Sequence, residues 1–256
     1  MIAVEWPAPS RVRVLSTART GGHSLGAWGL YGGLPGGLNL GLHVGDDATH
    51  VALNRARVER LTGLRILWMQ QVHGTQVLDA DSIEPTFPQP VPVADAALCT
   101  REDWALCIMT ADCLPVLFTD RQGRGVAAAH AGWRGLLGGV LEATVSALRF
   151  RLGEPAAELL AWLGPAIGPQ AFEVGDEVRQ AFVERDFASA QAFRPMGQSG
   201  KWLGDLEFLA RQRLADCGGV SIYGGGLCTV SDPARFYSHR RDRITGRMAS
   251  LIWLSN

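Results

Sequence analysis

Short apolar runs separated by turn residues recur along the whole chain. Runs of this kind are typical of β-strands, whose side chains are buried on one or both faces of a sheet. The runs that we expect to form strands are residues 12–15, 65–69, 106–109, 114–118, 125–131, 159–164, 220–223 and 249–254. The chain therefore predicts a fold built on many short strands.

Helical patterns lie between these runs, because apolar residues recur there every three or four positions. One helix follows Gly135 and is stopped by Gly153; a second is capped by Asp205 and ends at Gly218; Asp176 introduces a third. Their apolar faces would carry Leu137, Leu141, Thr144 and Leu148 in the first, Leu206, Leu209, Ala210 and Leu214 in the second, and Val178 and Phe182 in the third. Strands and helices mixed without strict alternation predict a layered α/β or α+β fold.

Two loops stand out from this pattern. Residues 21–37 contain eight glycines, but the Lys-Ser/Thr pair of a phosphate-binding loop is absent, so we expect a mobile surface loop. Residues 84–92 contain four prolines, which predicts a stiff, extended segment that could link two domains. Because neither half looks self-sufficient and no repeat is found, we expect residues 1–256 to form a single domain.

Composition excludes several classes of partner. The 24 Lys and Arg residues nearly balance the 25 Asp and Glu residues, so the net charge is −1 and nothing indicates nucleic acid or an anionic membrane. The N-terminal residues lack the basic start and apolar stretch of a signal peptide, and charged residues or prolines interrupt every long apolar run. Five cysteines without a tight repeat suit reduced thiols better than disulfides. We therefore expect a soluble cytoplasmic protein.

Three residues carry candidate chemistry. Cys113 and His130 lie at the ends of neighbouring apolar runs, and His73 follows an earlier run beside the turn residue Gly74. Two imidazoles and one thiolate would bind zinc and leave a fourth position open, whereas a structural zinc site needs four ligands and no CxxC pair occurs. Spacing alone does not show that the three meet, and each could simply pack in the core. The remaining cysteines are interpreted as packing residues: Cys99, Cys107, Cys217 and Cys228.

Five longer motifs identify a resemblance. They are "QVHGTQV", "TADCLPVLFTD", "AAAHAGWRGLLGGV", "LGPAIGPQAFEVGDEV" and "FYSHRRDRITGRMASLIWL". In this order they resemble the YfiH-type family, long labelled polyphenol oxidase or laccase-domain proteins and now associated with purine nucleoside phosphorylase activity. The similarity runs from residues 16–22 and 39–47 to the C-terminus. It implies that His73, Cys113 and His130 are the metal ligands. It also implies one domain of α/β/β/α layers with mixed sheets, related in its Cys–His geometry to cysteine hydrolases.

The chain departs from the family pattern at two positions. Many members have cysteine where this chain has Gln170, which rules out a thiol there. Many have an aromatic residue where this chain has His239, which could act as a further ligand, as a proton carrier or only as a surface histidine.

The resemblance implies phosphorolysis of adenosine, inosine, guanosine and methylthioadenosine, and hydrolytic deamination of adenosine. Zinc on the three ligands would activate a water molecule for deamination, and no organic cofactor is implied. Phosphorolysis needs a phosphate site, for which Arg134 at the start of a helix is the best candidate and Arg19, Arg240 and Arg241 are weaker ones. We expect Asn39, His43 and Gln71, which lie in family-like motifs, to contact substrate.

Other functions use the same residues. A metal-free cysteine hydrolase would activate the Cys113 thiolate with His130 and attack an amide, for example in a cell-wall precursor. A copper phenol oxidase needs many imidazoles, and the six histidines here include no HxH pair. An idle binding or regulatory protein would show no turnover of purine nucleosides. Sequence leaves the preferred nucleoside and the oligomeric state open.

Overall fold

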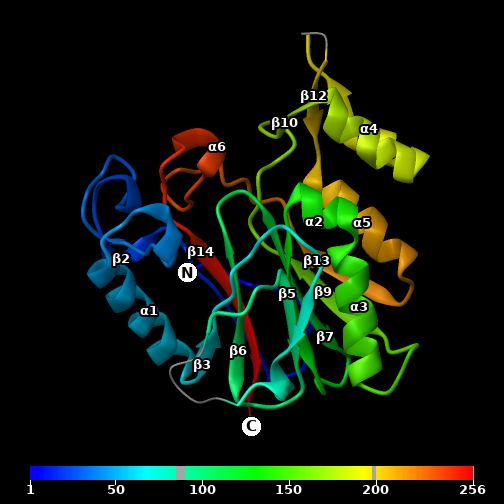
Figure 1. Ribbon diagram of the computed structural model, residues 1–256, viewed down its shortest axis with the longest axis horizontal. Coiled ribbons are helices and arrows are strands. Elements are labelled where there is room, and N and C mark those ends of the chain that lie inside the picture. Colours follow the sequence, from blue (N-terminus) through cyan, green and yellow to red (C-terminus); the bar gives the residue numbers. More distant parts are fainter. Residues whose placement is uncertain (85–89, 198–199, 256) are drawn as a thin grey trace.

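All eight runs expected to be strands form strands in the computed structural model, which describes residues 1–84, 90–197 and 200–255 (Figure 1). They correspond to β1 (Val12–Ser16), β3 (Arg65–Leu67), β6 (Trp104–Thr110), β7 (Leu114–Asp120), β8 (Val126–Ala131), β9 (Leu159–Leu163), β13 (Val220–Gly224) and β14 (Met248–Leu254). Six further strands were not expected: β2 (Thr20–Ser24), β4 (Val77–Asp79), β5 (Ala96–Cys99), β10 (Glu173–Gly175), β11 (Phe193–Pro195) and β12 (Lys201–Gly204).

The strands form two large mixed sheets. One has the order β1-β14-β6-β3, with only the β3–β6 pair parallel. The other has the order β13-β9-β7-β8-β5-β4, with parallel pairs at its two edges and antiparallel pairs between them. A small third sheet has the order β10-β12-β11. The mixed topology explains why strands and helices do not alternate strictly along the sequence.

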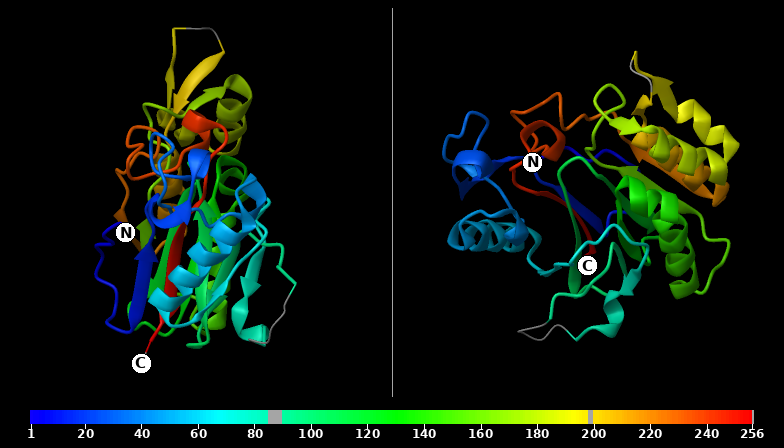
Figure 2. Two further views of the ribbon diagram at one scale, coloured as in Figure 1. Left: turned by 90° about the vertical axis from the view of Figure 1, so that its left-hand side faces the viewer. Right: turned by 45° about the horizontal axis from the view of Figure 1, so that its top comes forward.

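The two large sheets stack face to face, and helices cover their outer faces (Figures 1 and 2). Helix α1 (Ala48–Thr62) packs on the four-stranded sheet, while α3 (Val140–Arg151) and α5 (Leu206–Asp216) pack on the six-stranded sheet. The side chains of β6 alternate between the two faces of its sheet. Leu106 packs against the other sheet and Cys107 faces the α1 layer, so β6 is buried on both faces. The predicted α/β/β/α layering is confirmed, and Cys107 packs in the core as expected.

The helix predicted after Gly135 is in fact two helices, α2 (Trp133–Gly138) and α3. Gly139 separates them with a φ of 102°, a left-handed conformation that ends the first helix. Asp205 caps α5 as predicted and accepts a hydrogen bond from the amide of Phe208. The expectation for Asp176 is corrected, because Gly175 is the N-cap of α4 (Asp176–Arg185) and Asp176 is its first residue.

The remaining elements are short. The three-ten helices are η1 (Gly26–Trp28), η2 (Leu42–Val44), η3 (Ala80–Ser82) and η4 (Phe187–Ala192), and the last α-helix is α6 (His239–Asp242). The glycine-rich stretch begins inside β2 and runs into η1 at the surface. Most of the proline-rich segment, residues 85–89, lies outside the described residues. Among the described helices, none has the length and apolar character needed to cross a membrane.

Candidate metal centre

Cys113, His130 and His73 meet in space. Cys113 lies in the turn between β6 and β7, His130 lies on β8, and His73 lies in the loop after β3. Strands β7 and β8 are antiparallel neighbours, and Pro115 pairs with His130, which brings the thiol next to that imidazole. Sγ of Cys113 is 3.7 Å from Nε2 of His73, and the three possible ligand atoms lie within 4.8 Å of one another. These residues could therefore hold one metal ion.

The buried carboxylate of Asp95 orients two of these three residues. It accepts a hydrogen bond from Nδ1 of His130 at 2.8 Å and others from the amides of Val72, His73 and Gly74 at 2.7–3.0 Å. Because a carboxylate only accepts, Nδ1 of His130 carries the proton and Nε2 is left to bind a metal. Burial opposes the charge on Asp95, but the hydrogen bonds from His130 and the loop amides lower its pKa below the usual value.

Unusual backbone conformations position the candidate metal ligands His73 and Cys113. His73 has a φ of 62° and Asp112, next to Cys113, a φ of 93°, which are rare for residues other than glycine. The Asp112 carboxylate is held by the hydroxyl of Thr229 and the amide of Arg240, both at 2.6 Å. A Cβ on Gly132 would lie 2.7 Å from the His73 ring and 3.0 Å from the Cys113 sulfur. Glycine at position 132 therefore leaves room for the side chains of His73 and Cys113.

Cys113 and His130 shift each other's pKa in opposite directions. Burial disfavours a thiolate, but His130 and His73 outweigh it and lower the pKa of Cys113 to about 6. Burial also disfavours an imidazolium, but Cys113 and Asp95 raise the pKa of His130 to about 9. Between these values the metal-free protein holds a thiolate beside an imidazolium. A thiolate is the form of cysteine that binds metals and acts as a nucleophile.

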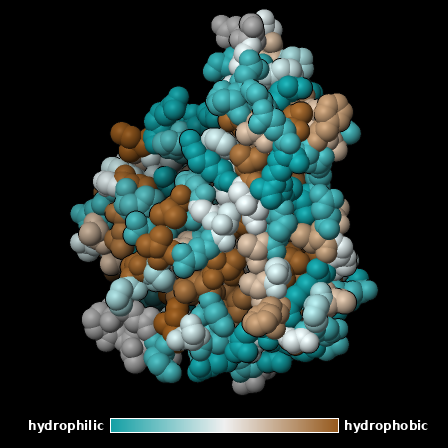
Figure 3. Space-filling view, turned by 45° about the vertical axis from the view of Figure 1, so that its right-hand side comes forward, coloured by the Kyte–Doolittle hydropathy of each residue, from teal (hydrophilic) through white to brown (hydrophobic). Residues whose placement is uncertain are grey.

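The three residues open into a cavity of about 650 Å³. Its other lining residues are Leu42, His43, Arg55, Trp68, Met69, Gln70, Gln71, Val91, Met109, Thr110, Ala111, His239 and Arg247. In the space-filling view, apolar side chains gather around a hollow on one face of the molecule (Figure 3). A cavity of this size accommodates a small organic ligand.

Two arginines give the cavity a positive wall, and His43 lies on the same lining. Burial lowers the pKa of Arg55 and of Arg247, and burial together with these two charges lowers the pKa of His43. Arg55 donates to the carbonyl of Leu40 and stacks on Trp68 at 3.9 Å, and Arg247 donates to carbonyls of its own loop. Among the described residues, neither guanidinium forms an ion pair with a carboxylate. Glu59 near Arg55 and Asp112 near Arg247 offset part of this charge, and half-buried guanidinium groups outside ion pairs can bind an anion.

Several residues expected to bind substrate lie elsewhere. Arg134 is exposed on α2 and stacks on Trp133 at 4.3 Å, away from the residues that line the cavity. Arg19 is 4% exposed and binds the carbonyls of residues 29 and 30, so it fixes the glycine-rich loop. Asn39 is fully buried, and its amide supports the backbone of residues 41 and 247. Local contacts hold these three side chains away from the cavity, and their roles in binding substrate stay predictions.

The C-terminal arginines, whose roles at a phosphate site stay predictions, also bind backbone carbonyls. The guanidinium of Arg240 binds the carbonyls of residues 171 and 173, and that of Arg241 binds those of residues 229, 230 and 236. Gln170 is exposed and does not line the cavity.

Three expected residues do line the cavity: His43, Gln71 and His239. The side-chain amide of Gln71 donates to the carbonyl of Met109 and accepts from the amide of Met109. These two hydrogen bonds fix this part of the cavity wall. Nδ1 of His239 lies 2.8 Å from the carbonyl of Arg243, which orients its ring.

Sequence reasoning missed Asp95, Arg55, Trp68 and Arg247. Asp95 carried a signal, since an acid directly before the buried strand β5 needs partners. Arg247 lies inside a quoted motif but had no feature that set it apart from its neighbours. Arg55 and Trp68 belong to a helix and a strand end, and only the fold shows that their side chains share a cavity.

An α/β/β/α fold with an open Cys–His–His group beside a cationic cavity defines a candidate metal-dependent enzyme. The chain belongs to the family described as multi-copper polyphenol oxidoreductase laccase, whose family model matches residues 13–255. It is 51% identical to the purine nucleoside phosphorylase PA4543 of Pseudomonas aeruginosa, over 98% of this chain and 97% of that protein. It is 47% identical to the purine nucleoside phosphorylase YfiH of Escherichia coli, over 99% and 98% of the two chains.

Solved structures agree with this assignment. The Neisseria meningitidis protein NMB0706 superposes with a TM-score of 0.90 at 47% identity, covering 100% of this chain and 99% of that one. YlmD from Geobacillus stearothermophilus superposes with a TM-score of 0.82 at 30% identity, covering 96% and 93%. The resemblance to the YfiH-type family is therefore confirmed.

Proposed function

We propose that this chain is a zinc-dependent purine nucleoside phosphorylase. The observation that carries the proposal is that one cavity is lined by both the Cys–His–His group and the two arginines. Relatives at 51% and 47% identity are named purine nucleoside phosphorylase, which supports this substrate class.

Phosphorolysis makes specific demands on the cavity. A phosphate oxygen bonds to C1′ of the ribose while the bond from C1′ to N9 breaks, and the purine leaves with the electron pair. The enzyme must hold phosphate in line, balance the charge that develops on the sugar, and provide a proton for the purine. In this proposal, Arg55 and Arg247 hold the phosphate and His43 adds a third donor. His239 exchanges the proton with the purine through Nε2, because Nδ1 contacts a carbonyl.

The donors suit zinc. Two imidazoles and a thiolate are preferred zinc ligands, so His73, Cys113 and His130 would hold a zinc ion, which would act as a Lewis acid. Asp95 fixes His130 and the His73 loop, as carboxylates beside metal-binding histidines do. Copper oxidation fits less well, because a multicopper enzyme needs several metal groups. The part of the chain that the structure describes holds one group of three such donors.

The same cavity would serve several substrates. We propose adenosine, inosine, guanosine and methylthioadenosine for phosphorolysis, and hydrolytic deamination of adenosine as a second activity. We also propose that residues 1–256 act as one domain and that the enzyme is cytoplasmic, since all five cysteines are free thiols. Small molecules rather than nucleic acid would be its partners, given the net charge of −1.

A metal-independent cysteine hydrolase is the second candidate. A thiolate with a pKa near 6 beside an imidazolium, which is itself held by Asp95, is the arrangement that activates cysteine nucleophiles. In that enzyme Cys113 would attack an amide carbonyl and His130 would protonate the departing amine. His73 favours the zinc enzyme, because a second imidazole has no role in a Cys–His pair but completes a zinc site.

Product analysis tests the proposal. Zinc-loaded protein is incubated with adenosine, with and without phosphate, and the products are separated by chromatography. Adenine and ribose 1-phosphate should form only with phosphate, whereas inosine should form under both conditions. A protein with one zinc per chain that forms none of these products would contradict the proposal. Zinc should be lost from His73→Ala and Cys113→Ala but retained in His50→Ala, which alters a histidine outside the group.

A further inference from the structure

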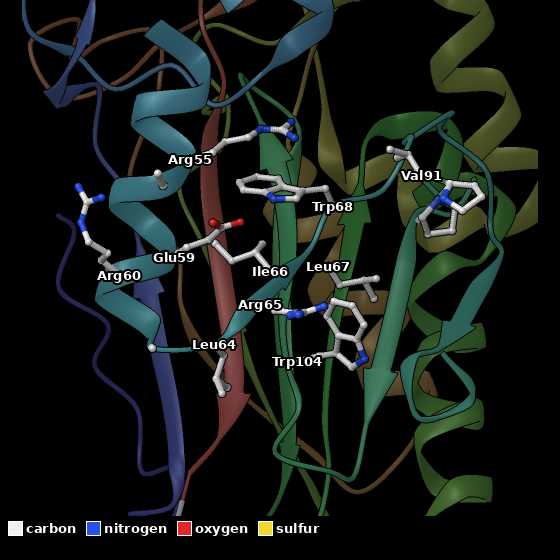
Figure 4. A pocket seen from close by; sticks show the side chains of 14 residues that line it. Arg55, Glu59, Arg60, Leu64, Arg65, Ile66, Leu67, Trp68, Val91 and Trp104 are labelled. Atoms are coloured by element: carbon white, nitrogen blue, oxygen red, sulfur yellow. The ribbon is translucent and has the colours of Figure 1, made fainter. Parts of the chain in front are cut away.

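A second cavity of about 830 Å³ adjoins the first, and we call it the side cavity. It lies between α1 on one wall and residues 90–92 on the other, with residues 64–68 as its floor (Figure 4). Figure 4 shows Arg55 and Trp68 at one end and Trp104 toward the other. Three residues, Arg55, Trp68 and Val91, line both cavities. The two cavities therefore adjoin at the proposed phosphate site.

The side cavity exceeds what the proposed reaction needs. Ligand pockets for drug-sized molecules occupy roughly 300–1,000 Å³, and the first cavity alone, at about 650 Å³, falls in that range. A nucleoside and a phosphate thus fit without the second space. Because the two cavities share lining residues, a group attached to the substrate could reach from one into the other.

The walls indicate the chemistry of that group. Nine of the fourteen lining residues are aliphatic, proline or aromatic, among them Ile66, Leu67 and Trp104, and the charged ones are Arg55, Glu59, Arg60 and Arg65. Val91, 56% exposed, adds an apolar wall opposite them. Transfer of an apolar group from water onto such a surface is favourable in proportion to the area buried. A charged extension would gain less from these contacts.

We propose that the side cavity is a substrate subsite for an apolar or aryl group carried by the nucleoside away from its C1′–N9 bond. The proposal rests on the proposed nucleoside phosphorylase activity and extends it to substituted nucleosides. Two positions can carry such a group without changing the reacting bond, namely N6 of the purine and the 5′ carbon of the ribose. N6-benzyladenosine and 5′-benzylthio-5′-deoxyadenosine represent the two.

The test compares kcat/KM for these two compounds with kcat/KM for adenosine, using zinc-loaded protein and excess phosphate. At least one benzylated compound should match or exceed adenosine. Ala56 lines the side cavity but not the reaction cavity, so Ala56→Phe should occupy space in the side cavity. It should lower kcat/KM for the accepted compound about tenfold relative to adenosine, and Ala56→Leu should do so less strongly. Arg57→Phe, on the exposed side of the same helix, should change neither value.

The outcomes separate the two proposals. Absence of any adenosine turnover would contradict the proposed function itself. Normal adenosine turnover with rejection of both benzylated compounds would overturn the subsite. Turnover of a benzylated compound that Ala56→Phe leaves unchanged would also overturn it, because the group would then lie elsewhere. Circular dichroism and the adenosine rate show whether each variant is folded.

Discussion

Nδ1 of His130 donates a hydrogen bond of 2.8 Å to the carboxylate of Asp95, and Asp95 is fully buried. The amide of His130 also donates to the carbonyl of Asp95, at 2.7 Å. One residue thus fixes the position of the β8 backbone and the rotation of the imidazole. Since the same carboxylate binds three amides of the His73 loop, two candidate metal ligands from distant segments share one anchor.

Replacing this anchor should weaken metal binding. In Asp95→Asn, one end of the side chain becomes a donor and faces amide groups that also donate, so the loop and the ring lose their common acceptor. We expect zinc affinity to fall about 10- to 100-fold. Competition with a chromophoric chelator measures this. Asp216→Asn, at an exposed position, serves as control. Wild-type affinity in Asp95→Asn would show that the loop holds its shape without the carboxylate.

Gly132 provides an independent test of the same geometry. The Cβ of Gly132→Ala would press on the His73 ring at 2.7 Å and on the Cys113 sulfur at 3.0 Å, closer than ordinary contacts. We expect the variant to fold but to retain less than about half of the wild-type zinc, because a metal site tolerates little displacement of its ligands. Metal analysis and thermal melting measure the two properties. Gly197→Ala, where a Cβ meets no atom within 4 Å, should behave as wild type; equal zinc in both variants would mean that the donors can shift apart.

The fold was predictable where burial leaves a pattern in the sequence. Strands such as β6 and β7 are buried on both faces, so they appear as continuous apolar runs. Helix α1 was missed because only Val51 and Val58 are its buried apolar residues, and a buried asparagine, Asn54, interrupts its apolar face. That residues 1–256 form a single domain stays a prediction, as does the relation to cysteine hydrolases.

The candidate site was predictable only in part. The three donors were found because thiol and imidazole groups at strand ends have distinctive chemistry and lie in recognisable motifs. Arg134 follows His130 closely in sequence but lies at the surface, outside the cavity that Arg55 and Arg247 line, so its role at a phosphate site stays a prediction. Whether an arginine binds substrate depends on which carbonyls and carboxylates surround it in three dimensions. Local sequence does not contain that information.

Arginine substitutions distinguish the two locations for phosphate. Arg55→Lys keeps the charge but loses the planar pair of donors, so we expect KM for phosphate to rise about tenfold or more. Deamination of adenosine, which needs no phosphate, should change much less. Steady-state kinetics with varied phosphate measures both effects. Arg134→Lys is the matched control and should leave KM for phosphate unchanged. A raised KM in Arg134→Lys with an unchanged KM in Arg55→Lys would instead locate the phosphate site at the start of α2.

The pH dependence of cysteine alkylation probes the Cys113 thiolate. Thiolates react with iodoacetamide and thiols do not, so the rate at each site follows the deprotonated fraction. In chelator-treated protein, the surrounding imidazoles lower the pKa of Cys113 to about 6. Its alkylation should therefore rise as pH increases through about 6 and be nearly constant above 7. Cys107, which burial gives a pKa of about 12, should stay unmodified over that range. Mass spectrometry of the digested protein assigns each rate.

Adding zinc before alkylation then separates the zinc enzyme from the cysteine hydrolase. If Cys113 is a ligand, the metal shields the sulfur, so alkylation should slow at least tenfold and phosphorolysis should return with bound zinc. If Cys113 is a free nucleophile paired with His130, zinc should not protect it. The chelated protein would also keep its activity, and an acyl group would be trapped on Cys113. An acyl adduct in metal-free, fully active protein would overturn the zinc assignment, because a sulfur that coordinates zinc for catalysis cannot also carry the substrate.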